Sequence, residues 1–232
     1  MKKFYAQKQD NKFIFEGEEL THFNIIRCRV GEEILCLGNG NTDYLCKVTE
    51  ISKKRAYAEI VKEVENTKNP KVNITVFQAF VKGEKLDLIV QKLTELGISN
   101  LVLFESEFAI AKQNNNKQER MEKISKEACK QCGRNIPLII GESVKFDKMI
   151  QMLAGFDTIL FANEKNTQRV ENVLKNAKNI AIIVGSEGGF SDSEIKLILD
   201  AGACNFGLGE RILRAETACI ALASIVGYLT GV

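Results

Sequence analysis

The sequence predicts an α/β protein in two domains: a small β-barrel over residues 1–68 and a mostly parallel sheet covered by helices over 72–232. Three observations support this prediction. Short β-like runs spaced about ten residues apart fill the first part of the chain. Strand and helix patterns alternate from Val72 onward. Two glycine-rich loops near the C-terminus each follow a short apolar run, as loops at the ends of sheet strands do.

The predicted barrel consists of apolar runs separated by turn-forming clusters such as 38–41. We expect strands at 12–15, 33–37, 44–48 and 56–61. The polar segment 63–71, which contains Pro70, predicts a linker to the second domain.

In the second domain the apolar spacing separates strands from helices. The helix over 84–96, for example, has one apolar face and is followed by Gly97, a residue typical of helix C-termini. We expect strands at 72–81, 101–104, 137–140, 158–161, 180–184 and 204–207, and helices at 84–96, 119–134, 146–153 and 167–176.

Composition and charge describe an ordinary globular protein. The net charge is +2, so the overall balance does not by itself indicate nucleic acid. The longest apolar stretch, 218–229, is too short to span a bilayer, and no secretory signal pattern occurs at Met1. Seven cysteines without a disulfide framework fit a reducing compartment. We therefore expect a cytoplasmic protein that has no membrane partner. A zinc site usually needs four cysteine or histidine ligands. Apart from the pair Cys129 and Cys132, the chain offers a single histidine, His22, far away in the sequence, so we expect no metal site.

The predicted helix over 119–134 is amphipathic. Four basic residues fall on one face at helical spacing, and apolar residues fall on the opposite face. The basic residues are Lys123, Lys126, Lys130 and Arg134. This outer stripe either contacts the phosphates of an RNA or is an ordinary solvated face.

The first glycine-rich loop, 185–190, lies between a predicted strand and a helix. Ser191 and Glu194 form a capping-box pattern, so the helix should begin at about Asp192 and turn Ile195, Ile198 and Leu199 inward. Free backbone N–H groups at such a helix start can bind a small molecule. The loop matches neither a P-loop nor a dinucleotide fingerprint, and a purely structural turn is the alternative.

The second loop places Arg211 and Arg214 between a predicted strand and a nearly all-apolar helix. Arginines beside a buried element need an anionic partner or a polar pocket. The simpler alternative is that Glu216 pairs with one of them.

Several motifs together resemble the RsmE family of the SPOUT superfamily. They are GSEGGFS at 185–191, LGERILRAETA at 208–218, QKLTELGI at 91–98, QCGR at 131–134 and HFNIIR at 22–27. The match covers nearly the whole chain. Two residues depart from the family's usual pattern. Ser186 replaces the usual proline, which should loosen that turn. Lys3 replaces an arginine, so the positive charge is kept but the two-pronged hydrogen bonding of a guanidinium is lost.

The resemblance implies a SPOUT-type parallel sheet with a C-terminal trefoil knot, preceded by a PUA-like, RNA-binding β-barrel. It also implies an S-adenosyl-L-methionine-dependent methyltransferase that modifies N3 of a uridine in 16S ribosomal RNA. The implied cofactor-binding residues are Phe161, Ala162, Gly185, Glu187, Gly188, Leu208, Gly209, Ile212 and Leu213. The implied RNA-binding residues are Lys3, Arg27, Lys126, Lys130 and Arg134.

Two candidate catalytic residues follow from this chemistry. Arg214 could stabilise negative charge that develops on a uracil oxygen when N3 loses its proton. Glu216 is a candidate proton acceptor, and a structural salt bridge is its alternative role. The resemblance and the apolar pattern of 215–229 further predict a homodimer through the C-terminal helix, with Ala221, Ala223, Ser224 and Gly227 allowing close contact.

Two other functions are compatible with parts of this pattern. A SPOUT enzyme that methylates a ribose 2′-hydroxyl usually carries Ser-Leu-Asn-Val-Ser in its last loop, and this chain lacks that motif. A non-catalytic RNA-binding adaptor would not need both loops intact.

Overall fold

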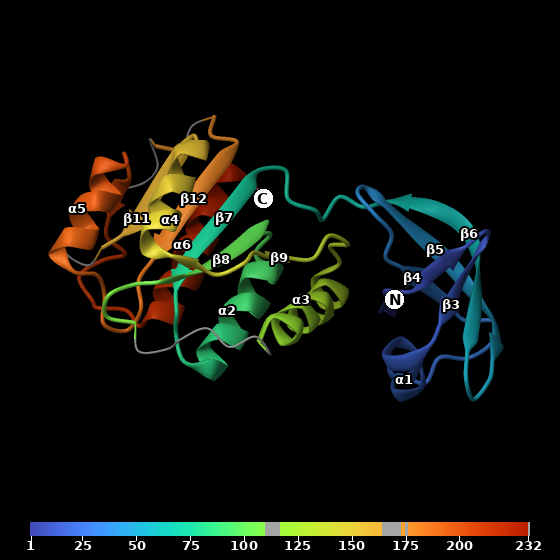
Figure 1. Cartoon of the computed structure of the whole chain (residues 1–232). Helices are drawn as coiled ribbons and strands as arrows, with labels where there is room; N and C mark the ends of the chain where they lie inside the picture. Colours follow the sequence, from blue (N-terminus) through green and yellow to red (C-terminus); the bar gives the residue numbers. More distant parts are fainter. Residues whose placement is uncertain (110–116, 164–172, 175, 232) are drawn as a thin grey trace. The chain divides into compact units, whose positions relative to one another are not determined.

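The computed structural model describes residues 1–109, 117–163, 173–174 and 176–231. It divides into two compact units, whose elements are labelled in Figure 1. The first unit comprises Met1–Asn69 together with Cys129–Ile136. The second comprises Pro70–Ala128 together with Pro137–Val232. The sequence did not indicate that a segment from the middle of the chain would pack with the N-terminal strands.

The first unit is built on a six-stranded sheet in the order β1-β4-β5-β6-β3-β2. Its strands are β1 (Lys3–Phe4), β2 (Gln7–Gln9), β3 (Lys12–Phe15), β4 (Glu33–Cys36), β5 (Thr42–Ile51) and β6 (Ala56–Glu65). Neighbouring strands are antiparallel except β1 and β4. The four predicted strands are confirmed, whereas β1, β2 and helix α1 (Gly17–Ile25) were not predicted. The predicted linker begins too early, because β6 runs to Glu65.

Aromatic side chains fill the interior of this unit. Phe15 lies 5.3 Å from Phe4 and 5.0 Å from Phe23 between ring centroids, and all three are fully buried. Helix α1 supplies Phe23 and Leu20 to this core. The unpredicted helix therefore covers the sheet with two apolar side chains spaced three residues apart.

A cluster of buried polar side chains fastens 129–136 to the first unit. Asp43 on β5 accepts hydrogen bonds from the side-chain amides of Asn66 (2.7 Å) and Asn135 (2.8 Å) and from the N–H of Gly38 (3.0 Å). Asn66 also donates to the Gly133 carbonyl at 3.0 Å. We call Asp43, Asn66 and Asn135 the asparagine cluster. Each is at most 5% exposed, so these bonds replace water that the groups have lost.

The second unit contains a seven-stranded sheet whose neighbouring strands are parallel, in line with the predicted mostly parallel sheet. Its order is β10-β8-β7-β12-β11-β13, with β9 also paired to β8. The strands are β7 (Asn73–Ala79), β8 (Asn100–Glu105), β9 (Ile139–Ile140), β10 (Val144–Lys145), β11 (Thr158–Ala162), β12 (Asn179–Val184) and β13 (Cys204–Phe206).

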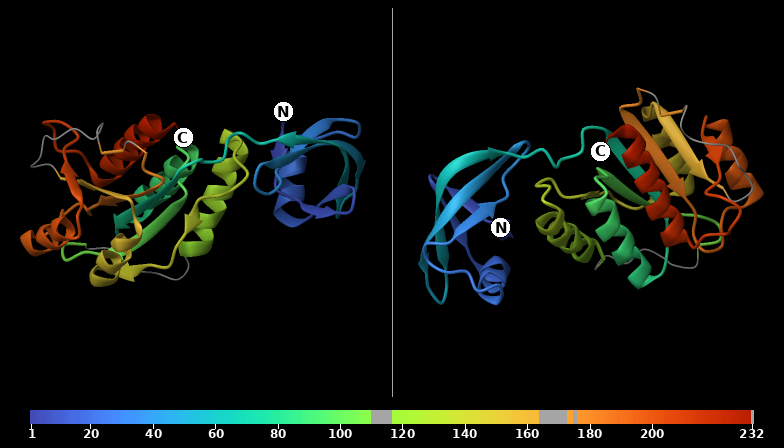
Figure 2. Two further views of the ribbon diagram at one scale, coloured as in Figure 1. Left: turned by 90° about the horizontal axis from the view of Figure 1, so that it is seen from above. Right: turned by 180° about the vertical axis from the view of Figure 1, so that it is seen from behind.

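Helices cover both faces of this sheet (Figure 2). The helices are α2 (Gly83–Glu95), α3 (Lys117–Cys132), α4 (Phe146–Met152), α5 (Asp192–Asp200) and α6 (Ala215–Thr230). Helices α2, α3 and α6 share one apolar cluster with one face of the strands. Helices α4 and α5 share another cluster with the opposite face, which includes Phe77, Phe104 and Phe161. The core is thus a three-layer sandwich.

Other details differ from the sequence predictions. Leu199 is 39% exposed, so α5 turns Ile198 inward but not Leu199, because the short helix presents only a narrow face to the sheet. The predicted helix over 167–176 lies mostly outside the described residues. No helix among the described residues has the length and apolar character that crossing a bilayer requires.

Candidate functional site

The carboxyl ends of β11, β12 and β13 surround a cavity of about 480 Å³. Parallel strands bring their C-terminal loops to one edge of a sheet, which is where α/β proteins bind ligands. All nine residues predicted to bind cofactor line this cavity: Phe161, Ala162, Gly185, Glu187, Gly188, Leu208, Gly209, Ile212 and Leu213. Arg211 and Arg214 line it as well. Segments far apart in the chain therefore form one wall.

Glycine is required at two positions of this wall. A Cβ atom added to Gly188 would lie 2.7 Å from the Cβ atom and 3.0 Å from the carbonyl oxygen of Phe108, too close for the backbone to accommodate. Gly209 has a φ of +108°, a conformation that other residues adopt only under strain. The two loops thus need glycine for different reasons, close packing in the first and backbone conformation in the second.

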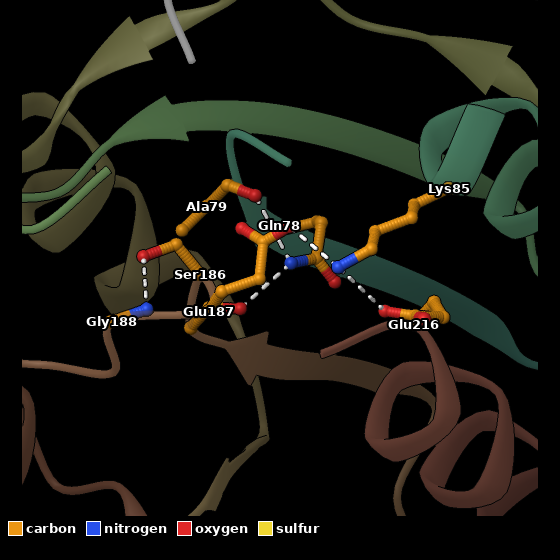
Figure 3. A network of polar contacts seen from close by, with 8 residues as sticks. Gln78, Ala79, Lys85, Ser186, Glu187, Gly188 and Glu216 are labelled. Carbon is orange, nitrogen blue, oxygen red and sulfur yellow. Dashed lines mark hydrogen bonds and ion pairs between the residues drawn. The ribbon is translucent and has the colours of Figure 1, made fainter. Parts of the chain in front are cut away.

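The first loop is held by hydrogen bonds from outside it and within it (Figure 3). Buried Gln78 on β7 donates its side-chain amide to the Gly185 carbonyl at 2.9 Å and to the Ala79 carbonyl at 3.0 Å. The Ser186 hydroxyl accepts from the Gly188 N–H at 3.4 Å, and the Ser186 carbonyl accepts from the Gly189 N–H at 3.0 Å. Ser186 therefore gives this turn a side-chain bond that proline could not make.

Glu194 fastens the loop at its other end. The predicted capping box is present: the Ser191 hydroxyl accepts from the Glu194 N–H, and one Glu194 carboxylate oxygen accepts from the Ser191 N–H at 3.0 Å. The other oxygen accepts from the Glu107 N–H at 2.9 Å. A buried carboxylate thus ties the start of α5 to the turn that follows β8.

The two arginines lie differently from the sequence prediction. Arg211 and Arg214 are both exposed at the cavity wall, and neither forms an ion pair with a described residue. Glu216 pairs with Lys85 instead of an arginine, at 3.6 Å. Sequence reasoning missed Lys85 because its partners are about a hundred residues away. The positive side chains of the second loop are therefore available to a ligand.

Lys85, in the first turn of α2, connects the first loop to the start of α6 (Figure 3). Its ammonium lies 2.7 Å from a Glu187 carboxylate oxygen and 3.6 Å from an oxygen of Glu216. The hydrogen bond to Glu187 raises the pKa of Lys85 above its ordinary value. The same bond lowers the pKa of Glu187. Both groups of the closer pair are therefore charged at neutral pH.

The predicted basic stripe is only partly exposed. Lys126 is exposed on α3, and Arg27 is exposed with a φ of +53°. Lys130 is 8% exposed and donates to Glu19 at 2.7 Å, so its charge is satisfied inside the first unit.

Two further predicted RNA-binding residues also lie within the first unit. Arg134, which follows the end of α3, is 1% exposed beside Tyr5, Cys129 and Cys132, and this burial lowers its pKa. Lys3 is half-buried and donates to the Gln131 carbonyl at 3.3 Å. The expectation of an exposed stripe is therefore wrong for Lys130 and Arg134, because long-range contacts bury both.

Helix α6 departs from the predicted dimer surface. Ala223 and Gly227 are buried in the chain's own core, where Gly227 lies against the end of α2, so neither can face a second subunit. The exposed apolar residues of α6 are Ile225, Tyr228 and Leu229.

The sequence matches two family models. An RNA methyltransferase domain model matches residues 67–227, and an RNA methyltransferase PUA domain model matches residues 15–61. The protein is 33% identical to ribosomal RNA small subunit methyltransferase E of Aquifex aeolicus, over 96% of this chain and 97% of that protein. It is 28% identical to the Bacillus subtilis protein of the same name, over 94% and 90%.

Solved structures also resemble the chain over nearly its whole length, and one of them carries the cofactor. The ribosomal RNA small subunit methyltransferase E of Neisseria gonorrhoeae bound to S-adenosyl methionine is 27% identical, with a TM-score of 0.91 over 99% of this chain and 98% of that one. Both the sequence and the α/β fold with its PUA-like N-terminal domain thus lead to one family. The chain belongs to the ribosomal RNA small subunit methyltransferase E family of RNA methyltransferases.

Proposed function

We propose that this protein transfers a methyl group from S-adenosyl-L-methionine to N3 of a uridine in 16S ribosomal RNA. One observation carries the proposal: both signature loops meet at a single cavity in a chain that belongs to this methyltransferase family. The Neisseria gonorrhoeae relative was solved bound to S-adenosyl methionine, which supports the cofactor. The reaction places the protein with small ribosomal subunits or their precursors in the cytoplasm.

The cofactor is expected in the cavity at the ends of β11, β12 and β13. The cavity volume lies in the range of small-molecule sites, and its wall mixes backbone N–H groups with apolar side chains such as Phe161 and Leu213. We infer that the segment from the first loop to α6 is threaded as a trefoil knot, as the family resemblance implies. Such threading would hold both loops in place around the adenosine and methionine parts of the cofactor.

Arg214 is the proposed electrophilic residue. Uracil N3 becomes a nucleophile when its proton leaves, and the resulting negative charge spreads onto the ring oxygens. A guanidinium at the cavity wall, free of ion pairs with the described residues, suits the stabilisation of that charge. Glu216 remains a candidate proton acceptor, although its contact with Lys85 favours an indirect role. Holding an extruded uridine in line with the methyl group would supply further rate enhancement.

RNA binding is proposed for the N-terminal unit, a PUA-like domain over roughly the first 68 residues, and for α3, whereas 72–232 is proposed to carry catalysis. Arg27 and Lys126 are exposed and suited to phosphate contact. For Lys3, Lys130 and Arg134 we propose a supporting role, since their contacts shape the same unit.

The enzymatic proposal is tested with undermethylated small ribosomal subunits and labelled cofactor. Mass mapping of the product should locate the label on N3 of one uridine. Label on a ribose oxygen or on another base would contradict the proposed target. Cofactor binding with no transfer to RNA would favour a non-catalytic adaptor.

We further propose a homodimer through α6. Tyr228 is 87% exposed, and Ile225 and Leu229 are each 39% exposed on the same helix. Burying these side chains against a second copy would remove a large apolar area from water. Tyr228→Glu should therefore yield folded monomers in light scattering, whereas Ala223→Glu should unfold the chain. A wild-type protein that is monomeric at micromolar concentration would contradict the dimer.

A further inference from the structure

Three segments of the second unit meet at one ammonium group. Lys85 comes from the start of α2, Glu187 from the first loop, and Glu216 from the first turn of α6. The ammonium lies 2.7 Å from Glu187 and 3.6 Å from Glu216, so one positive charge serves two carboxylates (Figure 3). Lys85 and Glu187 also line the cavity. The contact is thus part of the wall that the two loops form.

Glu216 depends on Lys85 more than Glu187 does. The Glu216 side chain is 12% exposed, and its Oε2 atom accepts no hydrogen bond from any described residue. Glu187 is 36% exposed, so water solvates part of its charge. A buried carboxylate oxygen that lacks a hydrogen bond needs a nearby positive charge to remain ionised.

No other charged group nearby takes this role. The neighbouring elements carry Lys82 and Glu84 at the start of α2, and Glu210, Arg211 and Arg214 on the second loop. All five are exposed, and among the described residues none forms an ion pair with Lys85, Glu187 or Glu216. Removing the ammonium would therefore leave two carboxylates without a counter-charge between the loop and α6.

We propose that Lys85 is a positioning residue for the cofactor site: it holds the first loop against the start of α6 through Glu187 and Glu216. The inference rests on the proposed function only in naming the cofactor as the ligand of this cavity. Without Lys85, repulsion between the carboxylates displaces the loop that carries Gly185 and Gly188, and the cofactor binds more weakly. Replacing one of the two carboxylates by an amide would remove that repulsion.

The test is calorimetric titration of S-adenosylmethionine and of S-adenosylhomocysteine into full-length protein at neutral pH. Lys85→Ala should weaken both affinities about fivefold, because partly exposed ion pairs contribute modestly. Lys85→Arg, which keeps the charge, should retain affinity. Adding Glu216→Gln to Lys85→Ala removes one of the two repelling charges and should restore most of the affinity.

Lys92→Ala is the matched control. Lys92 lies on the same helix and pairs with Glu95 at 2.8 Å, away from the cavity wall, so its removal should leave cofactor affinity unchanged. A defect in Lys85→Ala that Lys85→Arg shares, or that Glu216→Gln does not relieve, would mean a merely structural lysine and overturn the inference. Unchanged affinity in Lys85→Ala would overturn it too, while methyl transfer by the wild-type protein would still stand.

Discussion

The two glycine-rich loops and the basic end of α3 contrast in how well their sequence predicts their surroundings. Every loop residue predicted to bind cofactor lines one cavity. At the end of α3, Lys130 and Arg134 fit the exposed-stripe pattern equally well, yet both are buried. The residues of the loop motif are set by requirements of the local backbone, such as the positive φ of Gly209, and such local requirements can be recognised in the sequence. The exposure of a lysine depends on partners elsewhere, here Glu19 on α1.

The largest expected effect comes from removing Asp43, whose hydrogen bonds hold residues 129–136 in the first unit. Asp43→Ala removes the acceptor of three hydrogen bonds, two of them from the buried amides of Asn66 and Asn135 and one from the partly buried N–H of Gly38. We expect the free energy of unfolding to fall by about 3 kcal/mol, since buried unsatisfied donors are costly. Thermal and urea unfolding measure it.

Glu33→Ala is the control for that experiment, because Glu33 is exposed on neighbouring β4 and its side chain forms no hydrogen bond or ion pair with a described residue. It should change stability by no more than about 0.5 kcal/mol. Equal effects of the two substitutions would show that the asparagine cluster does not hold the segment.

The next prediction concerns the loops. Gly209→Val places a β-branched residue at a φ of +108°, at a cost of about 2 kcal/mol in the native loop conformation. Cofactor affinity should therefore drop about thirtyfold in calorimetry, with little change in RNA affinity. Gly155→Ala, where an added Cβ meets nothing within 4 Å, is the matched control. Normal cofactor binding by Gly209→Val would mean that the second loop does not form the site.

The smallest expected effect separates two lysines of one helix. Lys130→Ala should lower the free energy of unfolding by about 1 kcal/mol, because it leaves the Glu19 carboxylate without its partner. Lys126→Ala should leave stability unchanged and weaken RNA binding, with a smaller salt dependence. Filter binding at several salt concentrations and thermal unfolding measure the two effects. RNA affinity that is indifferent to Lys126 would make the exposed part of the stripe a solvated face.

Most of the strand and helix pattern could be predicted, because apolar periodicity is a local property. The strands of the second unit other than the two-residue β10, and the capping box at Ser191, are examples. Helix α1 was missed because its apolar content is low and only Leu20 and Phe23 are buried. The loop motifs identified the cavity wall, but they could not reveal Lys85, whose ion pairs join α2 to residues 187 and 216. Contacts between residues so far apart in the chain produce no regular spacing in the sequence from which they could be predicted.

The asparagine cluster also sets the order in which the chain can complete itself during synthesis. An N-terminal domain usually folds as soon as it leaves the ribosome. Here Asp43 on β5 and Asn66 just after β6 can bond to each other early, but Gly133 and Asn135, which complete their contacts, are translated only after β7, α2 and β8. The nascent N-terminal sheet therefore lacks part of its buried polar cluster until these elements of the second unit have been made. A gene fragment that encodes only the first 68 residues would never complete the cluster.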